Sequence, residues 1–275
     1  MEEQRRALIC IGDRPRSIRS LEFTRKVIQT YDYLPVLFHA LAQGSPTQKA
    51  DQLLTSANEI LKFENAEFLS VAGVPRKEIE RELKRREYRL VVLGTSERDP
   101  ALTPSPLCQY LANRLRTSVL LIRNPPDETC QILICTAGHR ESENAIDWGL
   151  HLAEKTNNKV TILHVVSSPP TMYTGLNEVE EKLTEVLARD VPLTQHLKAV
   201  ASKAEEIGVD AKLELRRGLV IEEIIRSAEI EAHDLVVLGA PPHQAILKQI
   251  LLGRVGPKVL ASTYRSTLIV RGPMK

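Results

Sequence analysis

Short apolar runs alternate with longer amphipathic stretches along the whole chain. The runs are rich in Val, Ile and Leu and are bounded by polar residues, which is typical of strands in a parallel sheet that is covered on both faces. The predicted strands are residues 7–11, 35–40, 66–71, 90–94 and 118–123, followed by 131–136, 160–166, 211–216, 234–239 and 266–271.

The stretches between the later strands have the apolar spacing of helices. They predict helices over residues 142–156, 176–207, 221–231 and 248–261. Strands that alternate with helices indicate βαβ units, and right-handed crossovers arrange such units as a doubly wound sheet with helices on both faces. The expected fold class is α/β and Rossmann-like.

The chain repeats itself. The run ALICI at 7–11 matches ILICT at 132–136, an offset of 125 that also relates Ser17 to Ser142 and His39 to His164. VVLG at 91–94 recurs at 236–239, and VLLIRN at 119–124 resembles TLIVRG at 267–272. An ordered series of matches indicates two tandem copies of one five-stranded domain. We predict domains over 1–124 (the first half) and 130–275 (the second half), joined by a linker at 124–129 that contains two prolines.

Composition narrows the class of protein. The 275 residues are 43% hydrophobic and 26% charged, and the net charge is +2. A balanced charge does not favour nucleic acid as a partner. No run reaches the length of a membrane span or has the pattern of a signal peptide, so we expect a cytoplasmic protein that does not enter a membrane. The four cysteines show no spacing suited to zinc, and reduced structural thiols are expected.

The loop after the fourth strand of the second half is the first candidate for chemistry. Ligands of doubly wound sheets bind at the carboxyl ends of the strands, where the strand order reverses. Gly239 ends a strand there, and Gly253 precedes an apolar helical run. Free N–H groups at a helix N-terminus suit phosphate. The alternative is that both glycines only turn the chain, and spacing does not separate the two interpretations.

Three segments of the second half together resemble the universal stress protein family. They are ILICTAGHRESENAIDWGLHLA at 132–153, VTILHVV at 160–166 and VVLGAPPHQAILKQILLGRVGPKVL at 236–260, and the final STLIVRG resembles the last strand of that family. The resemblance covers nearly the whole chain, once in each half, and the first half is more diverged. It implies an adenine nucleotide alpha hydrolase-like fold.

The resemblance also implies a nucleotide site, from which this sequence departs. Nucleotide-binding members have a loop G-x2-G-x9-G-[ST] that cradles phosphates and an Asp after the first strand. Here the middle glycine is missing, the spacing is one residue longer, and Arg254 replaces the hydroxyl residue. Ala137 stands at the position of the Asp. The implied cofactor-binding residues of the second half are Thr136, Ala137, Val165, Leu238, Gly239, Gly253, Arg254 and Val255.

The first half departs further. Gly12 takes the position of the Asp, although Asp13 is adjacent, and only Gly94 of the glycine loop remains. The loop carries three prolines, at positions 100, 104 and 106, which remove N–H donors. We expect no phosphate cradle of the usual kind in this half, which is interpreted as a structural or dimerisation copy.

Other polar residues have structural interpretations first. His39 and His164 lie inside predicted strands and are expected to be core residues bonded to backbone. His139 and Arg140 could reach an anion in the crevice, but a solvated loop is the simpler interpretation. Ser142 is expected to cap the following helix. Residues 176–207 are expected to pack on the sheet, and a mobile flap over the crevice or a partner surface is the alternative. No residue is predicted to be catalytic or to bind a metal.

The expected function is that of a tandem universal stress protein, a stress-response binding or regulatory module that is not an enzyme. No cofactor is assigned, although ATP, AMP or another anionic nucleotide could bind in the second half. Family members pair along their last strands, which implies that residues 119–123 (Val119 and Arg123 at the ends) lie beside residues 267–271 (Thr267 and Arg271 at the ends). A homodimer and an unidentified protein partner are also expected. The alternatives are a nucleotide-binding member with slow ATPase activity in the second half and a pure interaction scaffold.

Overall fold

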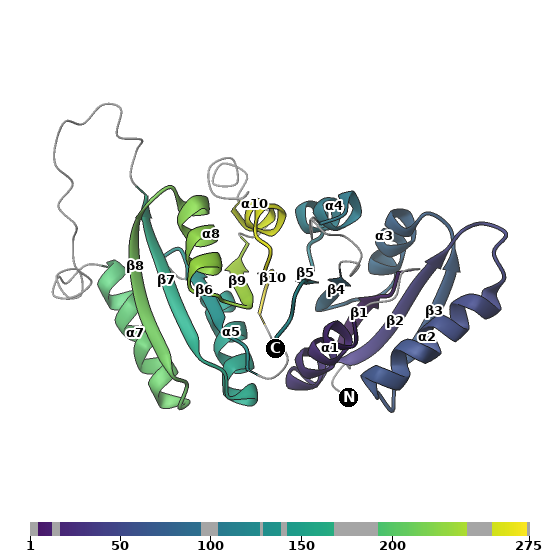
Figure 1. The fold of residues 1–275 in the computed structure, drawn as a ribbon, viewed down its shortest axis with the longest axis horizontal. Helices are drawn as coiled ribbons and strands as arrows, with labels where there is room; N and C mark the ends of the chain where they lie inside the picture. The colour runs from purple at the N-terminus through teal and green to yellow at the C-terminus, as the bar shows by residue number, and fades with distance from the viewer. Residues whose placement is uncertain are drawn as a thin grey trace.

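The chain forms one continuous ten-stranded sheet covered by helices on both faces (Figure 1). The computed structural model describes residues 5–12, 17–94, 104–126, 129–138, 142–167, 192–240 and 255–273. The strands are β1 (Arg6–Cys10), β2 (Leu34–Leu41), β3 (Glu67–Ala72), β4 (Leu90–Gly94), β5 (Ser118–Ile122), β6 (Ile132–Thr136), β7 (Val160–Ser167), β8 (Ala211–Gly218), β9 (Leu235–Gly239) and β10 (Ser266–Val270).

The helices lie in two layers. One face of the sheet carries α1 (Ile18–Thr30), α2 (Thr47–Leu61), α5 (Glu143–Thr156) and α7 (Pro192–Glu206), and the other carries α3 (Pro75–Arg85), α4 (Pro106–Arg114), α8 (Val220–Ile230) and α10 (Val255–Ser262). Successive strand residues face opposite layers, so Leu8 and Ile9 belong to different hydrophobic clusters. Both layers are therefore needed to cover a sheet whose strands are apolar on each face.

The sheet order is β3-β2-β1-β4-β5-β10-β9-β6-β7-β8. Each half has the same internal order, which reverses between β1 and β4 in the first half and between β6 and β9 in the second. Neighbouring strands within each half are parallel. The two halves meet where β5 lies antiparallel to β10, with Leu120 opposite Leu268. The two predicted five-stranded sheets are thus two parts of one sheet.

Hydrophobic packing also crosses from one half to the other. One cluster joins Val27 of α1 and Trp148 of α5, and a second joins Leu111 of α4 and Leu260 of α10. The four residues are almost completely buried. In Figure 1, α1 and α4 lie on the first-half side of the β5–β10 junction, and α5 and α10 lie on its second-half side. Helices of both layers therefore bury apolar surface across this junction.

The predicted strands are all present, and their ends differ from the prediction by at most two residues. The predicted helices 142–156 and 221–231 correspond to α5 and α8. For the predicted helix 176–207, the described part is α7, which begins at Pro192, where a proline is tolerated because the first turn lacks N–H partners. Residues 176–191 and 248–254 lie outside the described residues. No described helix is both long enough and apolar enough to cross a membrane.

Candidate functional site

The carboxyl ends of β6, β7 and β9 meet at one edge of the second half. The register pairs Thr136 with His164 across β6 and β7, and Cys135 with Leu238 across β6 and β9. The strand order reverses between β6 and β9, which is where doubly wound sheets form a ligand crevice. The fold therefore provides the location that the sequence predicted for a ligand.

Predicted site residues gather at this edge. Leu238 is buried in a hydrophobic cluster against which Val165 of β7 and Val255 of α10 pack. Ala137 and Gly239 are exposed at the ends of β6 and β9. The edge therefore combines an apolar wall with open backbone at two strand ends.

Four of the residues singled out in the second half lie outside the described residues: His139, Arg140, Gly253 and Arg254. The phosphate-binding role considered for the loop 239–253 therefore stays a prediction. The structure describes the strand ends at this edge and the residues that surround the turn after β6.

The turn after β6 is closed by a serine from α5. The Ala137 N–H donates to Ser142 Oγ at 2.8 Å. Ser142 lies at the N-cap position of α5, but its side chain makes no capping hydrogen bond to the helix. The expectation that Ser142 caps the helix was therefore wrong in its detail, because the hydroxyl oxygen is used by the turn. Its equivalent, Ser17, does cap α1, with Oγ accepting from the Ser20 N–H at 3.0 Å.

His39 and His164 occupy equivalent positions and make equivalent hydrogen bonds. His39 Nδ1 lies 2.8 Å from the Ile11 carbonyl oxygen, and His164 Nδ1 lies 3.0 Å from that of Thr136. Both rings are buried. Each histidine ties the end of the second strand of its half to the end of the first strand, so the core interpretation of both residues is confirmed.

Two residues of α7 reach the same turn, and the sequence did not point to them. His196 Nε2 lies 2.8 Å from Thr136 Oγ1. Gly138 has a φ of +78°, and a Cβ built there would lie 2.8 Å from Leu193 Cδ1 and 2.9 Å from His164 Cε1. A side chain at position 138 would therefore collide with Leu193 and His164. The sequence analysis placed a flap over the crevice among the alternatives for this segment, but it did not identify these two contacts, because α7 comes more than fifty residues after the turn and meets it only through the fold.

The corresponding edge of the first half contains a cavity of about 210 Å³. It lies at the ends of β1, β2 and β4, beside the N-terminus of α4, and Phe38, Ile79 and Leu93 form apolar walls. Ser105 caps α4 by accepting from the Cys108 N–H at 3.2 Å. No Asp, Glu, Lys or Arg is among the described residues that line the cavity.

No cluster of three or more potential metal ligands is present among the described residues. Among the described residues, this edge of the second half thus has an apolar wall, two open strand ends and a turn whose polar groups are held by serine and histidine side chains. None of the described residues of the turn carries a carboxylate that could accept from the hydroxyls of a ribose.

A sequence model of the universal stress protein family matches residues 130–271, which is just over half of the chain. The chain belongs to the universal stress protein family. A universal stress protein of Methanocaldococcus jannaschii is 30% identical over 155 residues, covering 56% of this chain and 89% of the relative. One from Bacillus subtilis is 29% identical over 146 residues, covering 51% of this chain and 98% of the relative.

A solved structure resembles both halves of this universal stress protein at once. The structure of a universal stress protein from Archaeoglobus fulgidus superposes with a TM-score of 0.63 and covers 98% of this chain and 97% of that one. At 13% identity this likeness shows the fold alone. The overall fold of both halves is therefore shared with that structure.

Proposed function

We propose that this universal stress protein is a stress-response binding or regulatory module whose second-half crevice does not hold ATP in the family's usual way. The observation that carries the proposal is the turn after β6. There the residue at the position of the ligand-binding Asp is Ala137, and its N–H donates to Ser142 Oγ. The turn therefore offers a ligand neither a carboxylate nor a free N–H at residue 137.

The energetic consequence can be estimated. A hydrogen bond between a carboxylate and a ligand hydroxyl contributes about 1.5–3 kcal/mol. Its loss corresponds to roughly ten- to hundredfold weaker binding. The altered loop adds to this loss, because proline replaces the middle glycine and Arg254 replaces a hydroxyl residue. Arg254 could instead contact an anion directly, which keeps a smaller nucleotide as a candidate ligand.

Native mass spectrometry of the full chain with millimolar ATP, and separately AMP, tests the proposal. We expect no ATP adduct on the wild type. The variant Ala137→Asp restores the carboxylate at an exposed position and should show the first detectable adduct. One ATP per chain on the wild type, lost in Gly253→Asp, would overturn the proposal and favour a nucleotide-binding member with ATPase activity. The same spectra report whether the chain forms a homodimer.

A further inference from the structure

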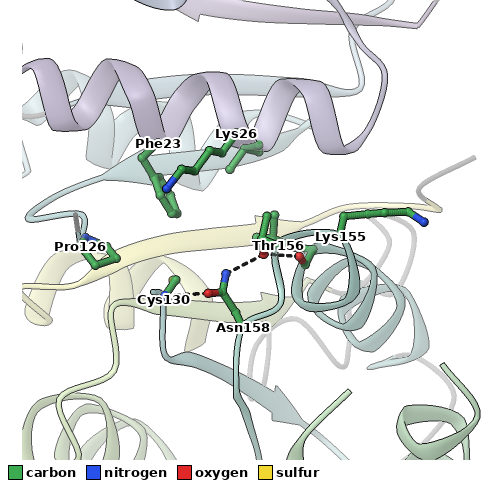
Figure 2. Close-up of a pocket in the computed structure, with 9 residues that line it drawn as sticks. Phe23, Lys26, Pro126, Cys130, Lys155, Thr156 and Asn158 are labelled. Atoms are coloured by element: carbon green, nitrogen blue, oxygen red, sulfur yellow. Dashed lines mark hydrogen bonds between the residues drawn. The ribbon is translucent and has the colours of Figure 1, made fainter. Parts of the chain in front are cut away.

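A second cavity lies between the two halves, far from the strand ends described above. It has a volume of about 270 Å³ and is lined by residues of α1 and α5 and by Pro126 of the linker (Figure 2). Its lining includes Phe23, Lys26 and Val27 of α1 and Leu152 and Thr156 of α5. We call it the α1–α5 cavity. Protein interiors are close-packed, so an opening of this size between two packed helices calls for a physical explanation.

The internal repeat supplies a comparison for this cavity. At the offset of 125, Phe23 corresponds to Trp148, Thr156 to Tyr31 and Asn158 to Tyr33. On the other side of the α1–α5 contact these aromatic residues fill the space. The ring centroids of Tyr31 and Trp148 are 4.6 Å apart, those of Tyr33 and Trp148 are 6.1 Å apart, and all three residues are buried.

The cavity therefore exists because the equivalents of Trp148, Tyr31 and Tyr33 that line it are smaller residues. Tyr31 also donates its hydroxyl to the Trp148 carbonyl oxygen at 2.6 Å, a bond that Thr156 is too short to reproduce. The same backbone arrangement is filled by side chains around Tyr31 and Trp148 and leaves a cavity around Thr156 and Phe23. The difference lies in the side chains and not in the fold.

The polar groups at the base of the cavity are satisfied by the protein itself. The Cys130 N–H donates to Asn158 Oδ1 at 2.8 Å, and Asn158 Nδ2 donates to Thr156 Oγ1 at 2.6 Å (Figure 2). Thr156 Oγ1 in turn donates to the Leu152 carbonyl oxygen at 2.5 Å. With these groups occupied, the walls formed by Phe23, Val27 and Leu152 favour an apolar body.

One charged group of the cavity stands out. Lys26 is half-buried, and no carboxylate in the described part of the chain forms an ion pair with it. The second lysine of the lining, Lys155, is exposed and pairs with Glu154 at 3.0 Å. In Figure 2 the Lys26 side chain runs alongside Phe23, whereas Lys155 extends away from Thr156 and Asn158. A single cation beside apolar walls is complementary to an apolar molecule with one negative charge.

We propose that the α1–α5 cavity binds a small monocarboxylic acid with an apolar body, with its carboxylate on Lys26 and its body against Phe23, Val27 and Leu152. This site is separate from the crevice of the second half, and the proposal stands whatever that crevice binds. Because both halves and the linker line the cavity, an occupant would contact the two halves together and stabilise their packing.

The test uses benzoate as the probe, with benzyl alcohol as its uncharged counterpart, titrated into the full chain by isothermal titration calorimetry. We expect one benzoate site per chain and at least about tenfold weaker binding of benzyl alcohol. Lys26→Met keeps the apolar stem and should weaken benzoate binding about tenfold. Lys155→Met is the matched control and should leave the affinity within about twofold, because this lysine is exposed and already paired.

A filling variant locates the site. Tyr31 is the equivalent of Thr156 in the first half. Thr156→Tyr should therefore fill the cavity with a tyrosine side chain and abolish benzoate binding. Val27→Phe serves the same purpose if the tyrosine variant does not fold. Benzoate binding that both Lys26→Met and a filling variant leave unchanged would place the site elsewhere and overturn the proposal. Absence of binding at millimolar benzoate would also overturn it.

Discussion

Arg123 and Arg271 hold the two halves together by the same contact made in opposite directions. Arg123 follows β5 and donates from Nη2 to the Leu260 carbonyl oxygen in the last turn of α10, at 2.5 Å. Arg271 follows β10 and donates from Nη2 to the Ala112 carbonyl oxygen in the last turn of α4. Each guanidinium thus lies at the C-terminus of a helix from the other half, where the helix dipole favours a positive charge.

Two serines complete this arrangement. The Arg123 N–H donates to Ser266 Oγ at 3.1 Å, and the Arg271 N–H donates to Ser118 Oγ at 2.9 Å. Burial lowers the pKa of both arginines to about 10, so each remains charged at neutral pH. Buried charges of this kind are retained where hydrogen bonds compensate for the lost solvent.

The first prediction concerns Arg123. Arg123→Met should lower the free energy of unfolding by about 2–3 kcal/mol, because the helix carbonyl loses a charged donor and stays buried. Urea unfolding measures the change. Arg226→Met is the control, since Arg226 is exposed and its pair with Glu223 at 3.2 Å should contribute less than about 0.5 kcal/mol. Equal effects of the two substitutions would contradict a special role for Arg123.

The second prediction concerns the approach of α5 to the sheet. A Cβ built at Gly149 would lie 2.4 Å from Ile134 Cδ1, whereas one at Gly256 would lie 3.4 Å from Ile269 Cδ1. Gly149→Ala should therefore destabilise the protein by about 1–3 kcal/mol through overpacking. Gly256→Ala, also in a helix above a strand isoleucine, should be neutral or stabilising because alanine favours the helix. Thermal unfolding of both variants measures the two changes in stability. A Gly149→Ala protein as stable as the wild type would mean that α5 packs less closely on Ile134 than described.

The third prediction concerns the cysteines. Burial raises the pKa of Cys130 and Cys135 well above the ordinary value of a thiol, so both should stay unreactive at pH 8. Cys10 is more exposed than the other three and lines the cavity of the first half. Brief treatment with iodoacetamide, followed by peptide mass spectrometry, should therefore show modification at Cys10 first. Labelling of Cys130 or Cys135 at the same rate in the folded protein would contradict this order.

The fourth prediction concerns Glu229 and pH. Burial acts to raise the pKa of Glu229, but hydrogen bonds from Thr263, Tyr264 and Arg265 outweigh it and leave the pKa lowered. A lowered pKa in the folded state means that the unfolded chain takes up the proton first as the pH falls. The stabilisation by Glu229 is therefore fully present above the ordinary glutamate pKa of about 4.3 and is lost as the pH falls below it.

Melting temperatures between neutral and acidic pH measure this effect. Glu229→Gln should be less stable than the wild type at pH 7, and the difference should shrink below about pH 4. Glu222→Gln, an exposed position on the same helix, should show no such pH-dependent difference. A constant difference between Glu229→Gln and the wild type at all pH values would count against the role of the charge.

The sequence by itself determined the strands, the repeat and the family. Runs such as 132–135 are apolar at every position, a pattern that is typical of strands buried on both faces. The offset of 125 correctly paired His39 with His164, because equivalent residues of two copies meet equivalent surroundings in the same fold. The changes at Ala137 and Arg254 could likewise be identified by comparing this sequence with the family's loop.

Only the tertiary structure decided which side chains from distant segments meet. His196 reaches Thr136 because α7 crosses the edge of the second half, and nothing in the residues around position 196 indicates that neighbour. The α1–α5 cavity likewise follows from the packing of two helices whose facing residues lie more than a hundred positions apart. Periodicity reports which face of an element is buried, whereas the shape and charge of a site depend on what the opposite element brings to it.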